Sequence, residues 1–148
     1  AGQEVECLIG KAEHYVLGQK PYEASETFET SASTSKPRFT RFNERRKATK
    51  EMQTCAASYS WLSNAAKMNT YLMRHAWKKY TAPMLIIQAE QDDYVWTSQI
   101  QKFADKIKKH GIAECEYLYL PETKHETYSS NDETMDKYIN KILAFLQK

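Results

Sequence analysis

The stretch that decides the fold is TAPMLIIQAEQDDYV, residues 81–95. Met84 to Ala89 form a short, largely apolar run that is entered through Pro83 and ends at a charged turn, residues 90–93. A run of this length, without alternation and bounded by proline and polar residues, is typical of a parallel-sheet strand buried on both faces. Because α/β proteins build their sites just past such strands, Asp92 is a candidate site residue.

The segments that follow predict a strand–helix–strand–helix unit. Thr97 or Ser98 can cap a helix that ends at Gly111, and residues 114–120 alternate as a second strand. A last amphipathic helix is expected over residues 131–147. The sequence therefore predicts an α/β fold with a short parallel sheet and flanking helices, and its crossover should be right-handed.

An acid and an imidazole follow the two expected strands. Asp92 follows the first and His125 the second, 33 positions later (125 minus 92). The carboxyl ends of parallel neighbours lie at one edge of a sheet, so these side chains can meet in space. A carboxylate bonded to one ring nitrogen fixes the tautomer and leaves the other nitrogen free to take a proton from a serine. Each residue taken singly is more simply a turn residue or an exposed loop histidine, and Asp93 competes with Asp92.

Two short segments resemble a known family, the α/β-hydrolases, and within it the lysophospholipase- and monoacylglycerol-lipase-like serine hydrolases. Residues 82–95, APMLIIQAEQDDYV, are similar to one segment of that family. In that segment a proline precedes an apolar strand, and the strand is followed by Q-G/A-x-x-D-x-x-V. Residues 120–126, LPETKHE, are similar to its x-G-x-x-H-E loop. The resemblance implies that Asp92 is the acid and His125 the base of a catalytic triad.

The D-x-x-V spacing of the family selects Asp92 over Asp93, which is then a cap or a solvated neighbour. Two positions depart from the family pattern, because Ala89 and Glu122 stand where glycine is common. Neither departure removes a catalytic group.

Residues 1–80 differ in character from residues 81–148, and we expect two parts divided there. Residues 6–17 and 58–80 have helical patterns, whereas residues 22–37 are rich in Ser, Thr and Glu and predict a loop. STSKPRF (33–39) and SYSWL (58–62) are similar to T-S-x-x-R-F and T-Y-x-W-L elements of the family's lid. The resemblance implies a mainly helical lid or cap before the C-terminal α/β part.

Apolar side chains in the second helical stretch suit a lipid-like substrate. Trp61, Met68 and Tyr71 can wall an acyl chain, since apolar pockets bind such tails mainly through buried area. Plain core packing is the simpler interpretation of this stripe.

A basic run covers residues 36–50. Its simplest interpretation is a solvated helix face, and contact with a phosphate or an anionic headgroup is the functional alternative. Nucleic-acid binding is not expected, because the net charge of the chain is only +2. Seven basic side chains form the run: Lys36, Arg38, Arg41, Arg45, Arg46, Lys47 and Lys50.

The composition excludes several other classes of protein. The three cysteines are widely spaced and lack any C-x-x-C, which argues against a disulfide framework or a zinc site. We expect reduced thiols in a cytoplasmic protein, with no metal and no cofactor. No run approaches the roughly 18 apolar residues of a transmembrane helix.

The nucleophile of such a hydrolase is missing from the sequence. The chain has four glycines and no G-x-S-x-G, the motif that carries the serine in α/β-hydrolases. We therefore interpret the chain as the lid and last two strand–helix units of a larger serine hydrolase whose serine lies upstream. The 148-residue chain alone is expected to be inactive. The resemblance implies a carboxylic ester of a lipid-like molecule as substrate.

The rival hypothesis is a non-catalytic binding or dimerisation module. The expected strand from Met84 to Ala89 offers an unpaired apolar edge, through which two copies can pair into a homodimer.

Overall fold

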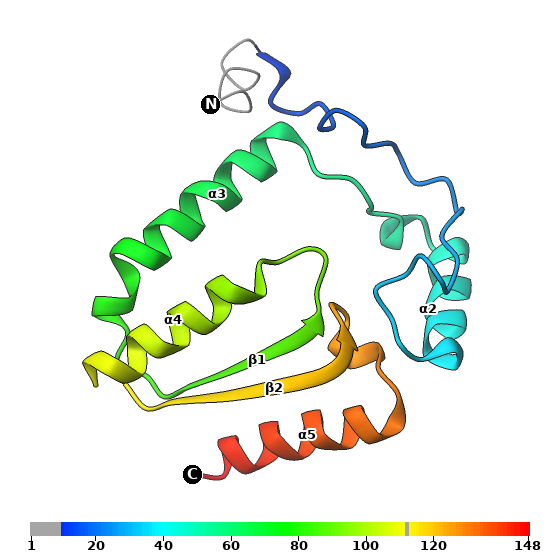
Figure 1. Ribbon diagram of the computed structural model, residues 1–148. Helices are drawn as coiled ribbons and strands as arrows, with labels where there is room; N and C mark the ends of the chain where they lie inside the picture. Colours follow the sequence, from blue (N-terminus) through cyan, green and yellow to red (C-terminus); the bar gives the residue numbers. More distant parts are fainter. Residues whose placement is uncertain (1–9, 112) are drawn as a thin grey trace. The chain divides into compact units, whose positions relative to one another are not determined.

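The computed structural model describes residues 10–111 and 113–148 (Figure 1). The chain forms two compact units. Unit 1 consists of the described part of Ala1–Glu26 together with Glu44–Ala76, and unit 2 consists of Thr27–Asn43 and Trp77–Lys148. Helix α2 (Lys36–Ala48) begins in unit 2 and ends in unit 1.

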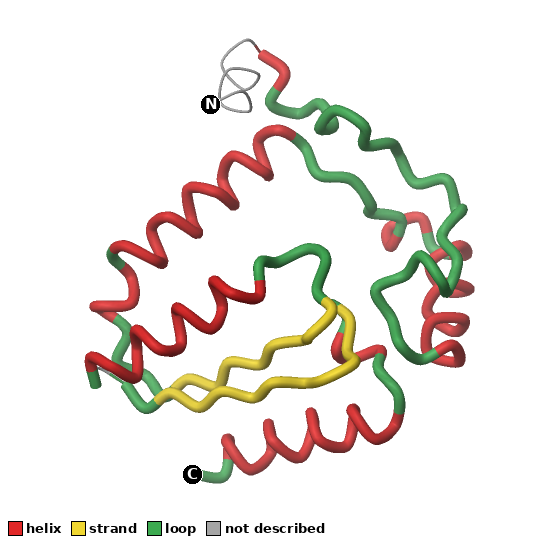
Figure 2. Tube along the Cα trace, viewed as in Figure 1, coloured by secondary structure: helices red, strands yellow, loops and turns green. Residues whose placement is uncertain are grey.

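Unit 2 is built on a two-stranded parallel sheet. Strand β1 (Met84–Gln91) pairs with β2 (Cys115–Lys124), with Met84 opposite Cys115 and Ala89 opposite Leu120. Helix α4 (Thr97–His110) connects the strands and contacts both of them. Helix α5 (Asp132–Leu146) contacts β2 and lies on the side of the strand pair opposite α4 (Figure 1). The order of strands and helices, followed in Figure 2, confirms the predicted strand–helix–strand–helix unit.

The ends of the helices show why they stop where they do. Gly111 follows α4 in the left-handed conformation, with φ 59°, and its amide donates to the carbonyls of Ile107 and Lys108. Asn131 caps α5 by accepting from the amide of Thr134 at 2.9 Å.

The prediction that Thr97 or Ser98 caps α4 was wrong. Trp96 occupies the N-cap position and makes no side-chain capping bond. Thr97 and Ser98 already lie in the helix. In the preceding turn, the carboxylate of Asp92 accepts hydrogen bonds from the amides of Tyr94 and Val95.

The expectation that β1 is buried on both faces was right only for two residues, because Glu90 and Gln91 at its carboxyl end are exposed. Gln88 and Ala89 are buried, whereas residues 84–87 are half-buried. In the described part of the chain β1 pairs with β2 alone, so its other edge has no neighbouring strand. The side chains of Ile107 and Leu120, 0% and 1% exposed, form the centre of the core.

Strand β2 is longer than expected and contains an irregularity beside the site. The register shifts after Ala89, so Glu90 alone faces residues 121–123. The carboxylate of Glu90 holds this bulge, because it accepts from the amide of Glu122 at 2.7 Å and from the hydroxyl of Tyr119 at 2.8 Å. These two hydrogen bonds, the amide first, lower the pKa of Glu90. The bulge carries the chain to His125 at the end of β2.

Glu122 occupies a backbone conformation that favours glycine, with φ 52°. A non-glycine residue in the left-handed region is strained by about 1–2 kcal/mol, whereas glycine costs about 0.5–1 kcal/mol in unfolded-chain entropy. Glu122→Gly is therefore expected to raise the free energy of unfolding by about 0.5–1 kcal/mol. Urea unfolding measures the change. A matched Glu44→Gly inside α2 should instead lower stability by about 1 kcal/mol, and a loss in both variants would contradict the account.

Unit 1 contains helix α3 (Tyr59–Arg74) and the 3₁₀ turn η2 (Lys50–Met52). Ser58 caps α3 by accepting from the amide of Trp61 at 3.2 Å. The prediction of a helix in residues 58–80 is confirmed up to Arg74, after which the chain turns into a second 3₁₀ segment, η3 (Ala76–Lys79).

The helix expected over residues 6–17 was wrong in part. Residues 6–9 lie outside the described residues, and residues 12–17 form turns and an isolated antiparallel bridge between Tyr15 and Ser58. The amide of Val16 donates to the carbonyl of Ala57. Backbone pairing with a distant segment thus replaces helical hydrogen bonding.

The two units do not divide at residue 80, because Thr27–Asn43 belongs to unit 2. The physical reason is a set of hydrogen bonds between residues 31–35 and residues 124–129. That residues 1–80 act as a lid stays a prediction.

Most of the basic run on α2 is exposed, as expected of a solvated helix face. Two of its arginines make specific contacts, one in each unit. In unit 2, Arg38 pairs with Asp132 at 2.6 Å. In unit 1, Arg46 pairs with Glu26 at 2.9 Å and lies over the ring of Tyr22.

Candidate active site

Asp92 follows β1 directly and is held by its own loop. Its Oδ1 accepts from the amides of Tyr94 and Val95, both at 2.9 Å. The Asp92 side chain is only 7% exposed. Because two amides fix one oxygen, the other oxygen, Oδ2, has a defined direction, and it lies 2.8 Å from His125 Nδ1.

His125 is the first residue after β2, and its side chain is 42% exposed. The ring of Tyr94 lies beside the imidazole, with the ring centroids 5.0 Å apart. In residues 10–111 and 113–148, no hydrogen-bond partner is found for His125 Nε2. Parallel pairing of β1 and β2 thus brings the two predicted site residues together, as the sequence indicated.

The charge of Asp92 sets the tautomer of His125. Burial alone would raise the pKa of Asp92, but the hydrogen bonds from His125, Tyr94 and Val95 together outweigh it and lower that pKa. Asp92 is therefore a carboxylate at neutral pH, and Nδ1 of His125 must donate to it. The lone pair then lies on Nε2, which is the arrangement that a general base requires.

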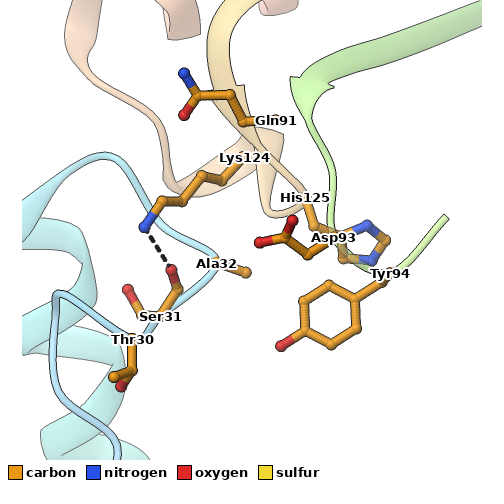
Figure 3. Close-up of a pocket in the computed structure, with 8 residues that line it drawn as sticks. All are labelled: Thr30, Ser31, Ala32, Gln91, Asp93, Tyr94, Lys124 and His125. Atoms are coloured by element: carbon orange, nitrogen blue, oxygen red, sulfur yellow. Dashed lines mark hydrogen bonds between the residues drawn. The ribbon is translucent and has the colours of Figure 1, made fainter. Parts of the chain in front are cut away.

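A small pocket of about 70 Å³ lies beside this pair. Figure 3 shows Lys124 reaching the carbonyl of Ser31, with the side chains of Asp93 and Tyr94 beside the His125 ring. Asp93, the competing acid, thus lines the pocket, whereas Asp92 makes the contact with His125. The pocket is lined by Thr30, Ser31, Ala32, Gln91, Asp93, Tyr94, Lys124 and His125.

The three proposed acyl-chain residues belong to unit 1. Trp61, Met68 and Tyr71 are on α3 in unit 1, with 63%, 58% and 46% of their surfaces exposed. This exposure gives no support to plain core packing within unit 1. A role in substrate binding stays a prediction.

Sequence reasoning missed the other residues around the pair. Tyr94 had a local signal, because it is a bulky residue two positions after the candidate acid. Ser31 and Ala32 had none, since Ser31 lies 93 positions from Lys124, its partner.

Within the part of the chain that the structure describes, no three His, Cys, Asp or Glu side chains are grouped to hold a metal ion. In residues 10–111 and 113–148, every helix is too short or too polar to cross a membrane.

The parallel strand pair with its flanking helices is consistent with a partial α/β-hydrolase fold. The model of the prolyl oligopeptidase family matches residues 24–148, which is more than half of the chain. The chain therefore belongs to the prolyl oligopeptidase family. A search of curated proteins finds no match.

Proposed function

We propose that His125 is the general base and Asp92 the orienting acid of a serine hydrolase. The observation that carries this is the 2.8 Å contact between Asp92 Oδ2 and His125 Nδ1, with Oδ1 held by two amides. The serine is supplied by a part of the protein outside these 148 residues, because the sequence holds no G-x-S-x-G.

The chemistry follows from the tautomer. His125 Nε2 takes the proton of the serine as its oxygen attacks the carbonyl, and the imidazolium that forms is stabilised by the Asp92 carboxylate. His125 then gives the proton to the leaving alcohol, which breaks the ester bond and leaves an acyl-enzyme. A water deprotonated by His125 hydrolyses that intermediate and regenerates the serine.

A lipid-like carboxylic ester, of the lysophospholipid or monoacylglycerol type, is the proposed substrate. Exposed apolar side chains next to the acid support it: Tyr94, Val95 and Trp96 are 70%, 41% and 78% exposed. Three consecutive exposed apolar residues are costly in water unless they meet an apolar partner. An acyl chain lying against this loop would bury that surface.

The loop predicts a dependence on acyl-chain length. In the serine-containing protein, Trp96→Ala is expected to lower kcat/KM for a long-chain ester about tenfold and to leave a short-chain ester unchanged. The physical reason is the loss of roughly 1–2 kcal/mol of apolar contact that only the long chain makes. The kcat/KM for nitrophenyl esters of increasing acyl-chain length measures this effect. Trp61→Ala is assayed on the same esters as a separate test of the α3 side chains.

A prolyl peptide anilide is the competing substrate, because the family is described as that of prolyl oligopeptidase. Faster cleavage of the anilide than of any ester would contradict the lipid proposal and keep the serine hydrolase. No hydrolysis of either, together with a dimer by sedimentation, would favour the rival module that pairs through the open edge of β1.

A further inference from the structure

Both sequence neighbours of His125 are tied to one distant segment, residues 31–35, which we call the strap. Lys124 Nζ donates to the carbonyl of Ser31 at 2.9 Å. The amide of Glu126 donates to the carbonyl of Ala32 at 3.1 Å. Successive carbonyls of the strap thus accept from the residues immediately before and after His125.

The strap also anchors the rest of the loop through Ser33, which is 1% exposed. The hydroxyl of Ser33 lies 2.7 Å from both the carbonyl and the hydroxyl of Ser129. The amide of Ser35 donates to the same carbonyl at 3.1 Å. Arg38, just past the strap, donates to the carbonyl of Ser130 at 2.7 Å. Residues 31–38 therefore hold the loop from Lys124 to Ser130 at its two ends, at Lys124 and Glu126 and at Ser129 and Ser130.

The contacts of the His125 ring with Asp92 and Tyr94 orient the imidazole, but its backbone lies just past β2, which ends one residue earlier. After the strand, the local backbone contributes a hydrogen bond from the amide of Thr127 to the carbonyl of His125 at 3.0 Å. A displacement of about 1 Å at a reacting group can cost about 100-fold in rate.

We propose that the strap sets the position of His125, with Ser33 and Lys124 as positioning residues. Ser33 is buried and acts on His125 only through the Ser129 end of the loop. Lys124 acts through the Ser31 carbonyl, and both residues line the pocket beside the imidazole. The inference rests on the proposed function of His125 as a base.

The signature of a positioned His125 is its Nδ1 proton, shielded from solvent by Asp92. In the ¹⁵N-histidine-labelled, serine-containing protein, we expect Ser33→Ala and Lys124→Met to speed exchange of this proton at least tenfold. Lys124→Arg keeps a donor for the Ser31 carbonyl, so this variant should retain the slow exchange of the wild-type protein. Ser98→Ala and Lys137→Met are matched controls, because Ser98 is exposed on α4 and Lys137 pairs with Glu133 on α5.

Steady-state kinetics complete the test. Ser33→Ala should lower kcat about 10- to 100-fold at nearly unchanged KM, because Ser33 moves the base and does not touch substrate. If the exchange rate of the Nδ1 proton and kcat were both unchanged in Ser33→Ala and Lys124→Met, the proposed role of the strap would be overturned. A wild-type protein without a protected Nδ1 proton and without activity would instead overturn the proposed function, so the two failures are distinguishable. Thermal unfolding separates either result from a general loss of fold.

Discussion

His125→Ala is expected to lower kcat by about 10⁶-fold in the protein that includes the serine nucleophile. The imidazole is the group proposed to take the serine proton, because its Nδ1 is bonded to Asp92 at 2.8 Å and its side chain is 42% exposed. Substrate binding should change little, so the loss falls on kcat rather than on KM. Ester hydrolysis at saturating substrate measures it.

The matched control is His75→Ala, since His75 is an exposed histidine of unit 1 that lies against the ring of Tyr71. This variant should keep wild-type kcat. More than a tenth of wild-type kcat in His125→Ala would mean that another residue is the base.

Asp92→Asn is expected to lower kcat by about 10⁴-fold with the fold intact, and the geometry gives the reason. Two amides donate to Oδ1 at 2.9 Å, so the carbonyl oxygen of the new amide must take that position. Its NH₂ group then faces His125 Nδ1, which can only accept from it. The ring proton moves to Nε2, and the base can no longer accept the serine proton.

Asp93→Asn is the control for this prediction, because Asp93 is adjacent in sequence and lines the pocket without contacting Nδ1. It should cost less than tenfold in kcat. A larger loss in Asp93→Asn than in Asp92→Asn would assign the acid to Asp93. Protonation of Nε2 in Asp92→Asn, read by ¹⁵N NMR, checks the tautomer directly.

The α/β part could be predicted because its signals are local. The apolar run from Met84 indicated a strand, and Gly111 ends α4 through its positive φ, a role with a clear sequence signature. Parallel pairing of the two strands then brought Asp92 and His125 to one edge of the sheet, as the order of elements indicated.

The surroundings of the pair could not be predicted, because they depend on contacts between distant residues. The bulge in β2 is held by the Glu90 carboxylate across the sheet. The positive φ of Glu122 had one sequence signal, its place in a loop where glycine is common in the family. The strap lies 93 positions from Lys124, and its serines and alanine have the composition of an ordinary loop. For the same reason residues 12–17 were misassigned, since their pairing partner is Ser58.

The central claim is that Asp92 and His125 activate a serine outside these 148 residues. Fluorophosphonate labelling followed by intact mass tests it most directly, on this chain and on a version extended upstream, with His125→Ala in the longer one. We expect one adduct on the longer chain, absent from its His125→Ala variant and from the 148-residue chain. No adduct on either wild-type chain would contradict it, and an adduct on the short chain would place the nucleophile within it.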